Sequence, residues 1–168
     1  MAFPSVRDMV ELCKETGQPL YEVILESDLT ESGLTRAESE AEMHRLWSVM
    51  CATSAGYCST DRSMSGFAGG DAAKVSAAAA QGALYADGFF ADVMSEALKT
   101  AECNACMKRI VAAPTAGSCG VLPAVLLPLA RAGEADEEAV CEALYVAAGF
   151  GQVIAARATL AGAEGGCQ

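Results

Sequence analysis

Apolar residues recur at every third and fourth position through most of this chain, and that spacing restricts the fold more than any other feature. Met43, Leu46, Trp47, Met50 and Tyr57 keep this spacing, which places them on one side of a helix. No stretch shows the alternation of apolar and polar residues that a half-buried strand requires. The sequence therefore predicts an all-α fold, a compact domain of roughly seven helices.

Start and stop signals predict where these helices lie. Thr35 and Glu38 have the spacing of a capping box that opens a long helix. Gly17 is placed to end a short first helix, and Pro19 to open a second. Asp71 is expected to start an Ala-rich helix that runs to about residue 84. Three more helices are expected to begin near Phe89, Val121 and Asp136.

The predicted helix from Phe89 has an apolar spacing that indicates its inward face. We expect that face to carry Val93, Met94, Ala97, Leu98 and Ala101. The Ala and Gly residues of the helices from residue 71 onward allow close packing, within a core or against another chain.

The length of 168 residues suits one domain, 1–168, because such a chain buries a core without disulfides or metals as supports. No repeat or linker divides it. The N-terminus lacks the charged start and apolar run of a secretory signal. The eight cysteines are therefore expected to be reduced thiols in a cytoplasmic protein.

Charge and hydropathy exclude two classes of partner. The net charge is −11 and the Lys and Arg residues form no stripe, so nucleic acid is not expected to bind. Residues 110–130 carry no formal charge over a length that would span a bilayer. Because Pro114, Gly117 and Pro123 interrupt that segment, we predict a buried loop followed by a core helix and no membrane span.

Two Gly-rich loops precede predicted helices and share one design. They are Ser65–Ala72 (SGFAGGDA) and Ala113–Gly120 (APTAGSCG). Free backbone N–H groups at a helix start receive anions, Thr115 and Ser118 add hydroxyl donors, and Asp71 would accept from an ammonium group. Together these groups fit an amino-acid ligand. In the alternative interpretation the polar residues are helix caps and the glycines form tight turns.

Other candidate motifs are weak. Neither loop has the Gly-Lys-Ser/Thr of a nucleotide-binding P-loop. Cys103 and Cys106 form a CxxC without a second pair at zinc-site spacing. His44 has no apparent catalytic partner in sequence and is expected at or near the surface. Lys74 is expected to be a solvated helix lysine, and no lysine lies in a motif typical of pyridoxal phosphate attachment.

Three blocks in series carry a family resemblance: SGFAGGDA, then CNACMKRIVAAPTAGSCGVLPAVL, then AGFGQVIAARATLAGAEGGCQ. The series resembles the α subunit, or α domain, of the bacterial iron–sulfur-dependent L-serine dehydratases. The resemblance implies a mostly helical, cytoplasmic catalytic domain that pairs with a β subunit or β domain. It also implies conversion of L-serine to pyruvate and ammonia without pyridoxal phosphate, in amino-acid degradation and gluconeogenesis.

The same resemblance implies a [4Fe–4S] cluster whose open iron acts as a Lewis acid on the leaving hydroxyl. Cys167 matches a cluster ligand in the family's GGCQ block. The general base is not identified. By resemblance the two loops form the substrate pocket, with these candidate residues: Ser65, Gly69, Gly70, Asp71, Thr115, Gly117 and Ser118.

The chain departs from the family after Cys167, because the Cys-Asp-Pro-Val-Ala-Gly and Pro-Cys stretches that supply the other ligands are absent. One thiolate does not hold such a cluster. We therefore expect the N-terminal part of an α chain, inactive alone and self-associating. A related cluster-dependent cysteine desulfidase and a non-enzymatic helical module for amino-acid binding or assembly remain as alternatives.

Overall fold

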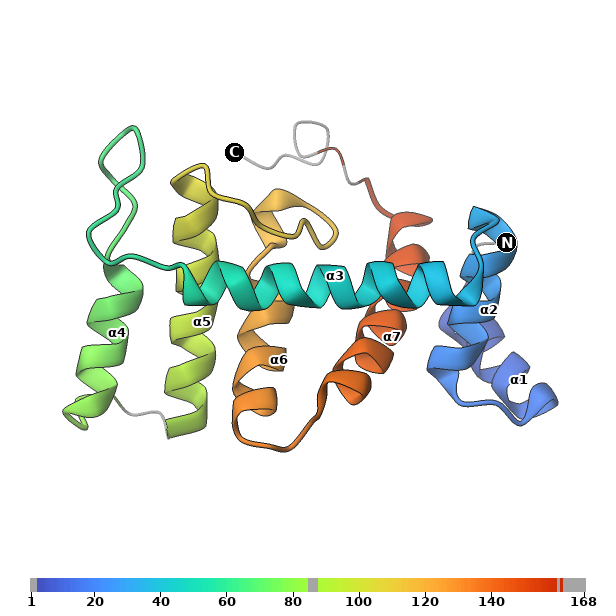
Figure 1. Cartoon of the computed structure of the whole chain (residues 1–168). Helices are drawn as coiled ribbons and strands as arrows, with labels where there is room; N and C mark the ends of the chain where they lie inside the picture. The colour runs from blue at the N-terminus through green and yellow to red at the C-terminus, as the bar shows by residue number, and fades with distance from the viewer. Residues whose placement is uncertain (1–2, 85–87, 160, 162–168) are drawn as a thin grey trace. The chain divides into compact units, whose positions relative to one another are not determined.

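The computed structural model describes residues 3–84, 88–159 and 161, and within them every regular element is helical (Figure 1). The all-α prediction is confirmed. The elements are α1 (Val6–Thr16), α2 (Leu20–Ser32), α3 (Arg36–Ala55), α4 (Asp71–Ala80), α5 (Gly88–Ala105), the 3₁₀ helix η1 (Ala116–Ser118), α6 (Val121–Arg131) and α7 (Glu137–Ala155).

Most helix ends follow the local signals in the sequence. Gly17 ends α1 with φ 72°, and its N–H donates to the carbonyl of Cys13 at 2.9 Å. The predicted capping box opens α3, because the Glu38 carboxylate accepts from the N–H of Thr35 at 2.9 Å. The Ala-rich helix α4 ends at Ala80, earlier than expected, because Gly82 adopts φ 65° and turns the chain.

The described residues form two compact units. The first comprises α1, α2, the start of α3 and α7, and the second comprises the rest of α3 with α4, α5 and α6. The sequence predicted one undivided domain. The boundary between Arg45 and Leu46 lies inside α3, so no break in composition or linker marks it.

In the first unit α2 packs against α1 and α7. Met9, Val23 and Ile24 are buried in this core. Gly149 of α7 faces Ile24 so closely that any side chain there would overlap the isoleucine. The close packing of small residues predicted from the sequence therefore occurs at this contact.

Helix α7 has the length and composition of a membrane-spanning helix, although core helices share both properties. Val140, Leu144 and Tyr145 are buried within the first unit. The uncharged segment 110–130 is not one helix, since a loop and η1 precede α6. The predicted order of a loop followed by a helix is confirmed for that segment, but the loop is not buried. Its exposed residues are Ala112, Pro114, Ala116 and Gly117.

In the second unit α5 lies between α4 and α6 and packs against both (Figure 1). Neighbouring helices run in opposite directions, so the starts of α4 and α6 lie beside the end of α5. The Gly-rich loops directly precede α4 and α6. The fold therefore brings both loops to the same end of α5.

Candidate functional site

Both Gly-rich loops are attached to the C-terminal half of α5. Glu102 of α5 accepts hydrogen bonds from the end of the first loop. Asn104 donates from Nδ2 to the carbonyl of Ala116 in the second loop at 3.1 Å. Gly120 approaches α5 closely, because a Cβ there would lie 2.8 Å from the carbonyl oxygen of Ala97. One helix thus holds the two segments that the sequence singled out.

The first loop ends on a carboxylate from α5. Glu102 Oε2 accepts from the N–H of Gly70 at 2.8 Å, and Oε1 accepts from Asp71 at 2.7 Å and Ala72 at 3.0 Å. The hydroxyl of Tyr57 donates to Oε2 at 2.7 Å. Glu102 is 6% exposed. Four donors therefore surround one buried carboxylate, and three of them are consecutive N–H groups at the start of α4.

These contacts shift the pKa values of both side chains. Burial alone would raise the pKa of Glu102, but the Tyr57 hydroxyl and the three N–H groups outweigh it and lower that pKa. Burial and the bond to Glu102 raise the pKa of Tyr57 to about 12. Glu102 is therefore a carboxylate, and Tyr57 its neutral donor, at neutral pH.

The backbone of the first loop requires glycine at two positions. Gly69 has φ 130° and Gly70 has φ 86°. A side chain on Gly69 would overlap the carbonyl oxygen of Asp61, and one on Gly70 would lie 3.0 Å from the guanidinium of Arg62. Arg62 itself donates to the carbonyl of Ser59 at 2.8 Å. Residues 59–62 and Glu102 thus hold the loop from two sides.

The polar side chains of the first loop point to the surface. Asp71 is exposed and pairs with Lys74 at 2.6 Å, and hydrogen bonding to that ammonium group lowers the pKa of Asp71. Lys74 is also exposed, as predicted. Ser65 lies in a tight turn where its hydroxyl is 3.1 Å from that of Ser63. Asp71 is thus available to a cationic group from solvent, in competition with Lys74.

The second loop is stabilised by its own residues. Thr115 donates its N–H to Ser118 Oγ at 3.2 Å, and Ser118 donates from Oγ to the carbonyl of Ala113 at 2.9 Å. The two hydroxyl oxygens lie 3.1 Å apart. Gly117 has open space, with Thr115 Oγ1 3.8 Å from an added Cβ.

Ser118 and Asp71 do not cap the helices that follow their loops. The N-cap residues of α6 and α4 are Gly120 and Gly70. Ser118 instead closes a capping box with Thr115 at η1.

The candidate residues of each loop are therefore held in defined positions, and their binding roles remain predictions. The N–H groups of Gly70 and Asp71 already donate to Glu102, so a substrate anion would have to displace that carboxylate. This contact was not predictable from local sequence, since Glu102 lies about thirty residues from the groups it binds.

The buried face of α5 differs from the predicted one. Met94 is 44% exposed and Ala101 is exposed, while Val93, Ala97 and Leu98 are half-buried. Because α4 and α6 pack on different sides of α5, it buries polar groups on more than one face, and Glu96 and Glu102 have hydrogen-bond partners there while the hydroxyl of Thr100 has none among the described residues. Its buried residues are Ala91, Ser95, Glu96, Thr100, Glu102 and Cys103.

Glu96 is a second buried carboxylate of α5, with different partners. It is 1% exposed and accepts from Ser54 at 2.5 Å, from Lys99 at 2.7 Å and from Arg131 at 2.6 Å. Burial would raise its pKa, but these donors, Arg131 first, lower it. Glu96 thus joins α3, α5 and α6, and these three partners lie outside both loops.

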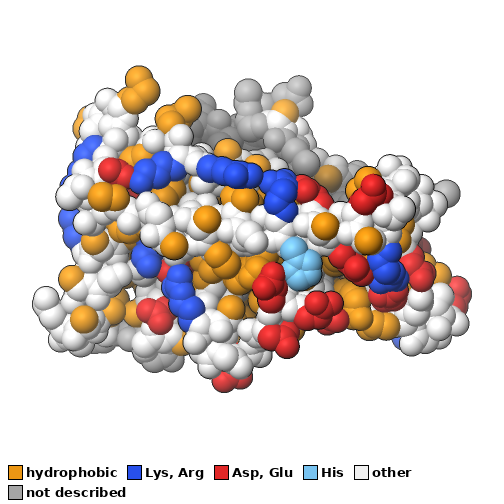
Figure 2. Space-filling model, viewed as in Figure 1, with side chains coloured by type: hydrophobic (Ala, Val, Ile, Leu, Met, Phe, Trp, Pro, Cys, Tyr) orange, Lys and Arg blue, Asp and Glu red, His pale blue; other side chains and the backbone are white. Residues whose placement is uncertain are grey.

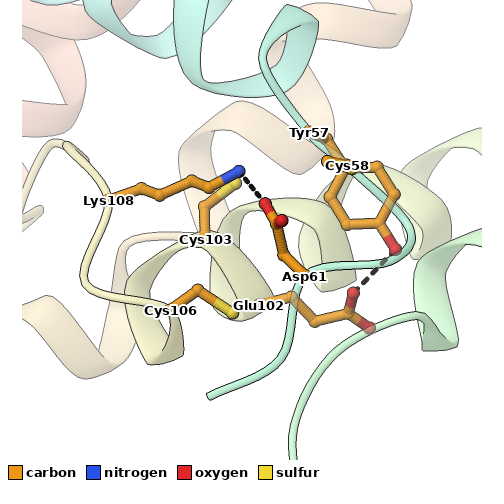
Figure 3. A pocket seen from close by; sticks show the side chains of 7 residues that line it. All are labelled: Tyr57, Cys58, Asp61, Glu102, Cys103, Cys106 and Lys108. Carbon is orange, nitrogen blue, oxygen red and sulfur yellow. Dashed lines mark hydrogen bonds and ion pairs between the residues drawn. The ribbon is translucent and has the colours of Figure 1, made fainter. Parts of the chain in front are cut away.

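The CxxC pair lies in a small pocket beside Glu102, with Tyr57, Cys58, Asp61 and Lys108 (Figure 3). Cys103 is buried, and burial raises its pKa. Lys108 and Asp61 form an ion pair across the pocket. The space is about 160 Å³ even with adjoining open solvent included, which is too small for an ordinary ligand site of roughly 300 Å³ or more.

Metal-ligand geometry is absent from the part of the chain that the structure describes, where no three His, Cys, Asp or Glu residues form a group that would hold a metal ion. The predicted cluster ligand, Cys167, lies outside the described residues. None of the seven described cysteines forms a disulfide.

His44 lies in the first unit and at the surface, as predicted. Its Nδ1 is 2.8 Å from Glu137 Oε1 and 3.6 Å from Cys141 Sγ. Figure 2 shows acidic side chains beside the chain's single histidine. The contact with the buried Cys141 was not foreseen, because the two residues are far apart in sequence.

The family model described as "Serine dehydratase alpha chain" matches residues 15–168. The chain belongs to this family. The match includes both Gly-rich loops and Glu102, so the arrangement on α5 belongs to a serine dehydratase alpha chain domain.

Curated relatives agree with this assignment. The "L-serine dehydratase, alpha chain" of Peptoniphilus asaccharolyticus is 34% identical over 98% of this chain and 56% of its own length. The "Probable L-serine dehydratase, alpha chain" of Bacillus subtilis is 32% identical over 99% of this chain and 55% of its own. "L-serine dehydratase 2" of Escherichia coli is 29% identical over 99% and 37%.

The chain thus spans about half the length of the first two relatives. No solved structure matches it.

Proposed function

We propose that this chain is the N-terminal part of the α chain or α domain of a cytoplasmic L-serine dehydratase, which converts L-serine to pyruvate and ammonia. The observation that carries the proposal is the family match over residues 15–168, with relatives named L-serine dehydratase that align over nearly the whole chain. The β subunit or β domain of such an enzyme is its proposed partner.

The two loops on α5 are the proposed substrate-binding elements. L-serine is a zwitterion, so its site needs an acceptor for the ammonium group and donors for the carboxylate. Asp71 is an exposed carboxylate in the first loop. Thr115 and Ser118 supply hydroxyls in the second, and the space at Gly117 beside them is open. We leave the general base unassigned.

For the complete enzyme we propose a [4Fe–4S] cluster, with Cys167 as one ligand, and no pyridoxal phosphate. The described residues do not fit such a cluster by themselves, because no group of three suitable ligands occurs among them. The remaining ligands would come from protein beyond these residues. No step of the reaction is therefore derived from the geometry of this chain.

Exposed apolar side chains support a protein partner or self-association. Val121 and Val125 lie one turn apart on α6 and are 60% and 45% exposed. Phe67 at the tip of the first loop is 93% exposed. We propose that another copy, the β partner or the remainder of the enzyme covers such residues. Light scattering of the chain at high concentration tests self-association, which a monomer would contradict.

The activity is tested on the protein as its host makes it. The protein is tagged at its N-terminus, purified anaerobically with whatever it binds, and treated with iron and sulfide. We expect pyruvate from L-serine and a visible absorption band from the cluster. Chain 1–168 alone, treated in the same way, is expected to stay colourless and inactive. Robust turnover by that chain alone would contradict the proposal.

The same preparation separates the rival functions. Sulfide release from L-cysteine without pyruvate from L-serine would indicate a cysteine desulfidase. L-serine binding by calorimetry without turnover of either amino acid would indicate a non-enzymatic helical module. Either result would reject L-serine dehydration.

A further inference from the structure

We propose that Glu102 is a positioning residue: it fills the anion site at the start of α4 and thereby fixes the Gly69–Asp71 loop for the ammonium end of the substrate. The inference rests on the proposed function for the identity of the substrate. Its structural part depends only on contacts within the second unit.

Helix α4 begins without a side-chain cap from its own N-cap residue. Its N-cap residue is Gly70, which has no side chain and therefore no cap of its own. Helix starts leave N–H groups that need an acceptor. Glu102 accepts from three consecutive residues there, Gly70, Asp71 and Ala72, within 3.0 Å. A carboxylate from α5 thus replaces the missing local cap.

With Glu102 bound at the start of α4, the first loop has no free anion site. A helix start of this kind would otherwise receive a free carboxylate from solvent. The buried Glu102 occupies that position, and Tyr57 completes its set of donors at 2.7 Å. A second carboxylate close by would be repelled. The Asp71 side chain remains exposed and negatively charged. The loop therefore accepts cations, and the substrate carboxylate binds elsewhere.

The position of Glu102 requires a carboxylate, because both of its side-chain oxygens accept from backbone N–H groups. Glutamine has nearly the same shape, but it offers one oxygen and one NH2 group. The NH2 group would face either the N–H of Gly70 or those of Asp71 and Ala72, so at least one backbone donor would lose its partner. Glu102→Gln is thus expected to loosen the first loop without creating a cavity in the core.

Glu96→Gln provides a matched control on the same helix. Glu96 is at least as buried as Glu102 and also ionised, but its partners are Ser54, Lys99 and Arg131. Both substitutions should weaken the fold, because each removes a buried charge from its partners. Only Glu102→Gln should disturb the start of α4.

The first measurement is amide hydrogen exchange on chain 1–168, resolved by residue with NMR. In Glu102→Gln we expect the amides of Gly70, Asp71 and Ala72 to exchange at least about tenfold faster than in Glu96→Gln, after each rate is corrected for global stability. Equal exchange in the two variants would overturn the positioning role. This result does not depend on any enzymatic activity.

The second measurement uses the enzyme purified from its host with each substitution. We expect Glu102→Gln to raise KM for L-serine about tenfold with kcat changed less than about threefold, and Glu96→Gln to leave KM within about twofold. Glu102→Asp, which keeps the charge, should recover part of the loss. A KM unchanged in an active Glu102→Gln enzyme would overturn the inference.

The two measurements also separate the inference from the proposed function. Faster exchange at residues 70–72, in an enzyme that never dehydrates L-serine, rejects the proposed activity and keeps Glu102 as the residue that fixes the loop. Dehydration of L-serine with unaffected exchange and unaffected KM rejects the role of Glu102 and keeps the activity.

Discussion

The two Gly-rich loops are alike in sequence, yet their polar groups find partners in opposite ways. The second loop is closed by neighbours, since Ser118 bonds to Ala113 and Thr115. The first loop is closed from a distance, since the N–H groups of residues 70–72 donate to Glu102. A local cap forms wherever its residues occur, whereas a distant one requires that α4 and α5 are already packed together.

Because their polar groups have different partners, the two loops also differ in the groups they leave for a ligand. A distant carboxylate removes the anion site from the first loop and leaves Asp71 as its exposed polar group. In the second loop the hydroxyls of Thr115 and Ser118 stay half-buried at the surface. Similar glycine and hydroxyl patterns therefore do not imply similar ligands.

The largest expected effect comes from one substitution made in both loops. Gly69→Ala should destabilise the fold by more than about 3 kcal/mol, because φ is 130° and the new Cβ overlaps the Asp61 carbonyl. Gly117→Ala should cost less than about 1 kcal/mol, because the site is open. Urea unfolding followed by circular dichroism measures both. Equal losses would remove the proposed distinction between the loops.

The next effect tests the distant partner of the first loop. Tyr57→Phe removes a hydrogen bond to a buried carboxylate and should lower the unfolding free energy by about 2 kcal/mol. Tyr21→Phe, whose hydroxyl bonds to Glu142 at a half-exposed site, is the control and should change it by less than about 0.5 kcal/mol. If both variants match the parent, Tyr57 contributes nothing to holding Glu102.

A smaller effect tests the local cap of the second loop. Ser118→Ala should lower the unfolding free energy by about 1 kcal/mol, the usual net contribution of a hydrogen bond. Hydrogen exchange at Gly70 should stay unchanged, because that residue depends on Glu102. Faster exchange at Gly70 would mean that the two loops are coupled through α5.

The smallest effect is a difference in pH dependence. The folded-state pKa of Glu102 lies below its ordinary value of 4.5. Its contribution is therefore fully present above the unfolded-state pKa and lost as pH falls through the folded-state pKa. The cost of Tyr57→Phe should shrink by up to about 1 kcal/mol below that range, and the cost of Ser118→Ala should not. Urea titrations from neutral to acidic pH compare them. Parallel curves would show that Glu102 is not the titrating partner.

Local signals explain which parts of the fold were predictable. The capping box at Thr35 and Glu38, the glycine after α1 and the acidic start of α7 act within one helical turn. The buried face of α5 was mispredicted, because an apolar spacing does not reveal that a helix lies between two others. The division into two compact units falls inside α3, where no local signal in the sequence marks it.

The candidate site was also predictable only in part. Residue types alone pointed to the two loops, and their hydroxyls and glycines lie where expected, before α4 and α6. Glu102 and Tyr57 escaped notice because their partners are 30 to 45 residues away. An acidic residue on the buried side of a helix was the one available signal, and two residues of α5, Glu96 and Glu102, share it.

By itself the sequence determined the helices, their caps, the two loops and the family, because each depends on residue types at short, fixed spacings. Only the tertiary structure decided which carboxylate fills the start of α4, since backbone donors take whichever acceptor the packing brings within about 3 Å. Antiparallel packing of α4 on α5 made that acceptor Glu102. The polarity of the first loop follows from this contact.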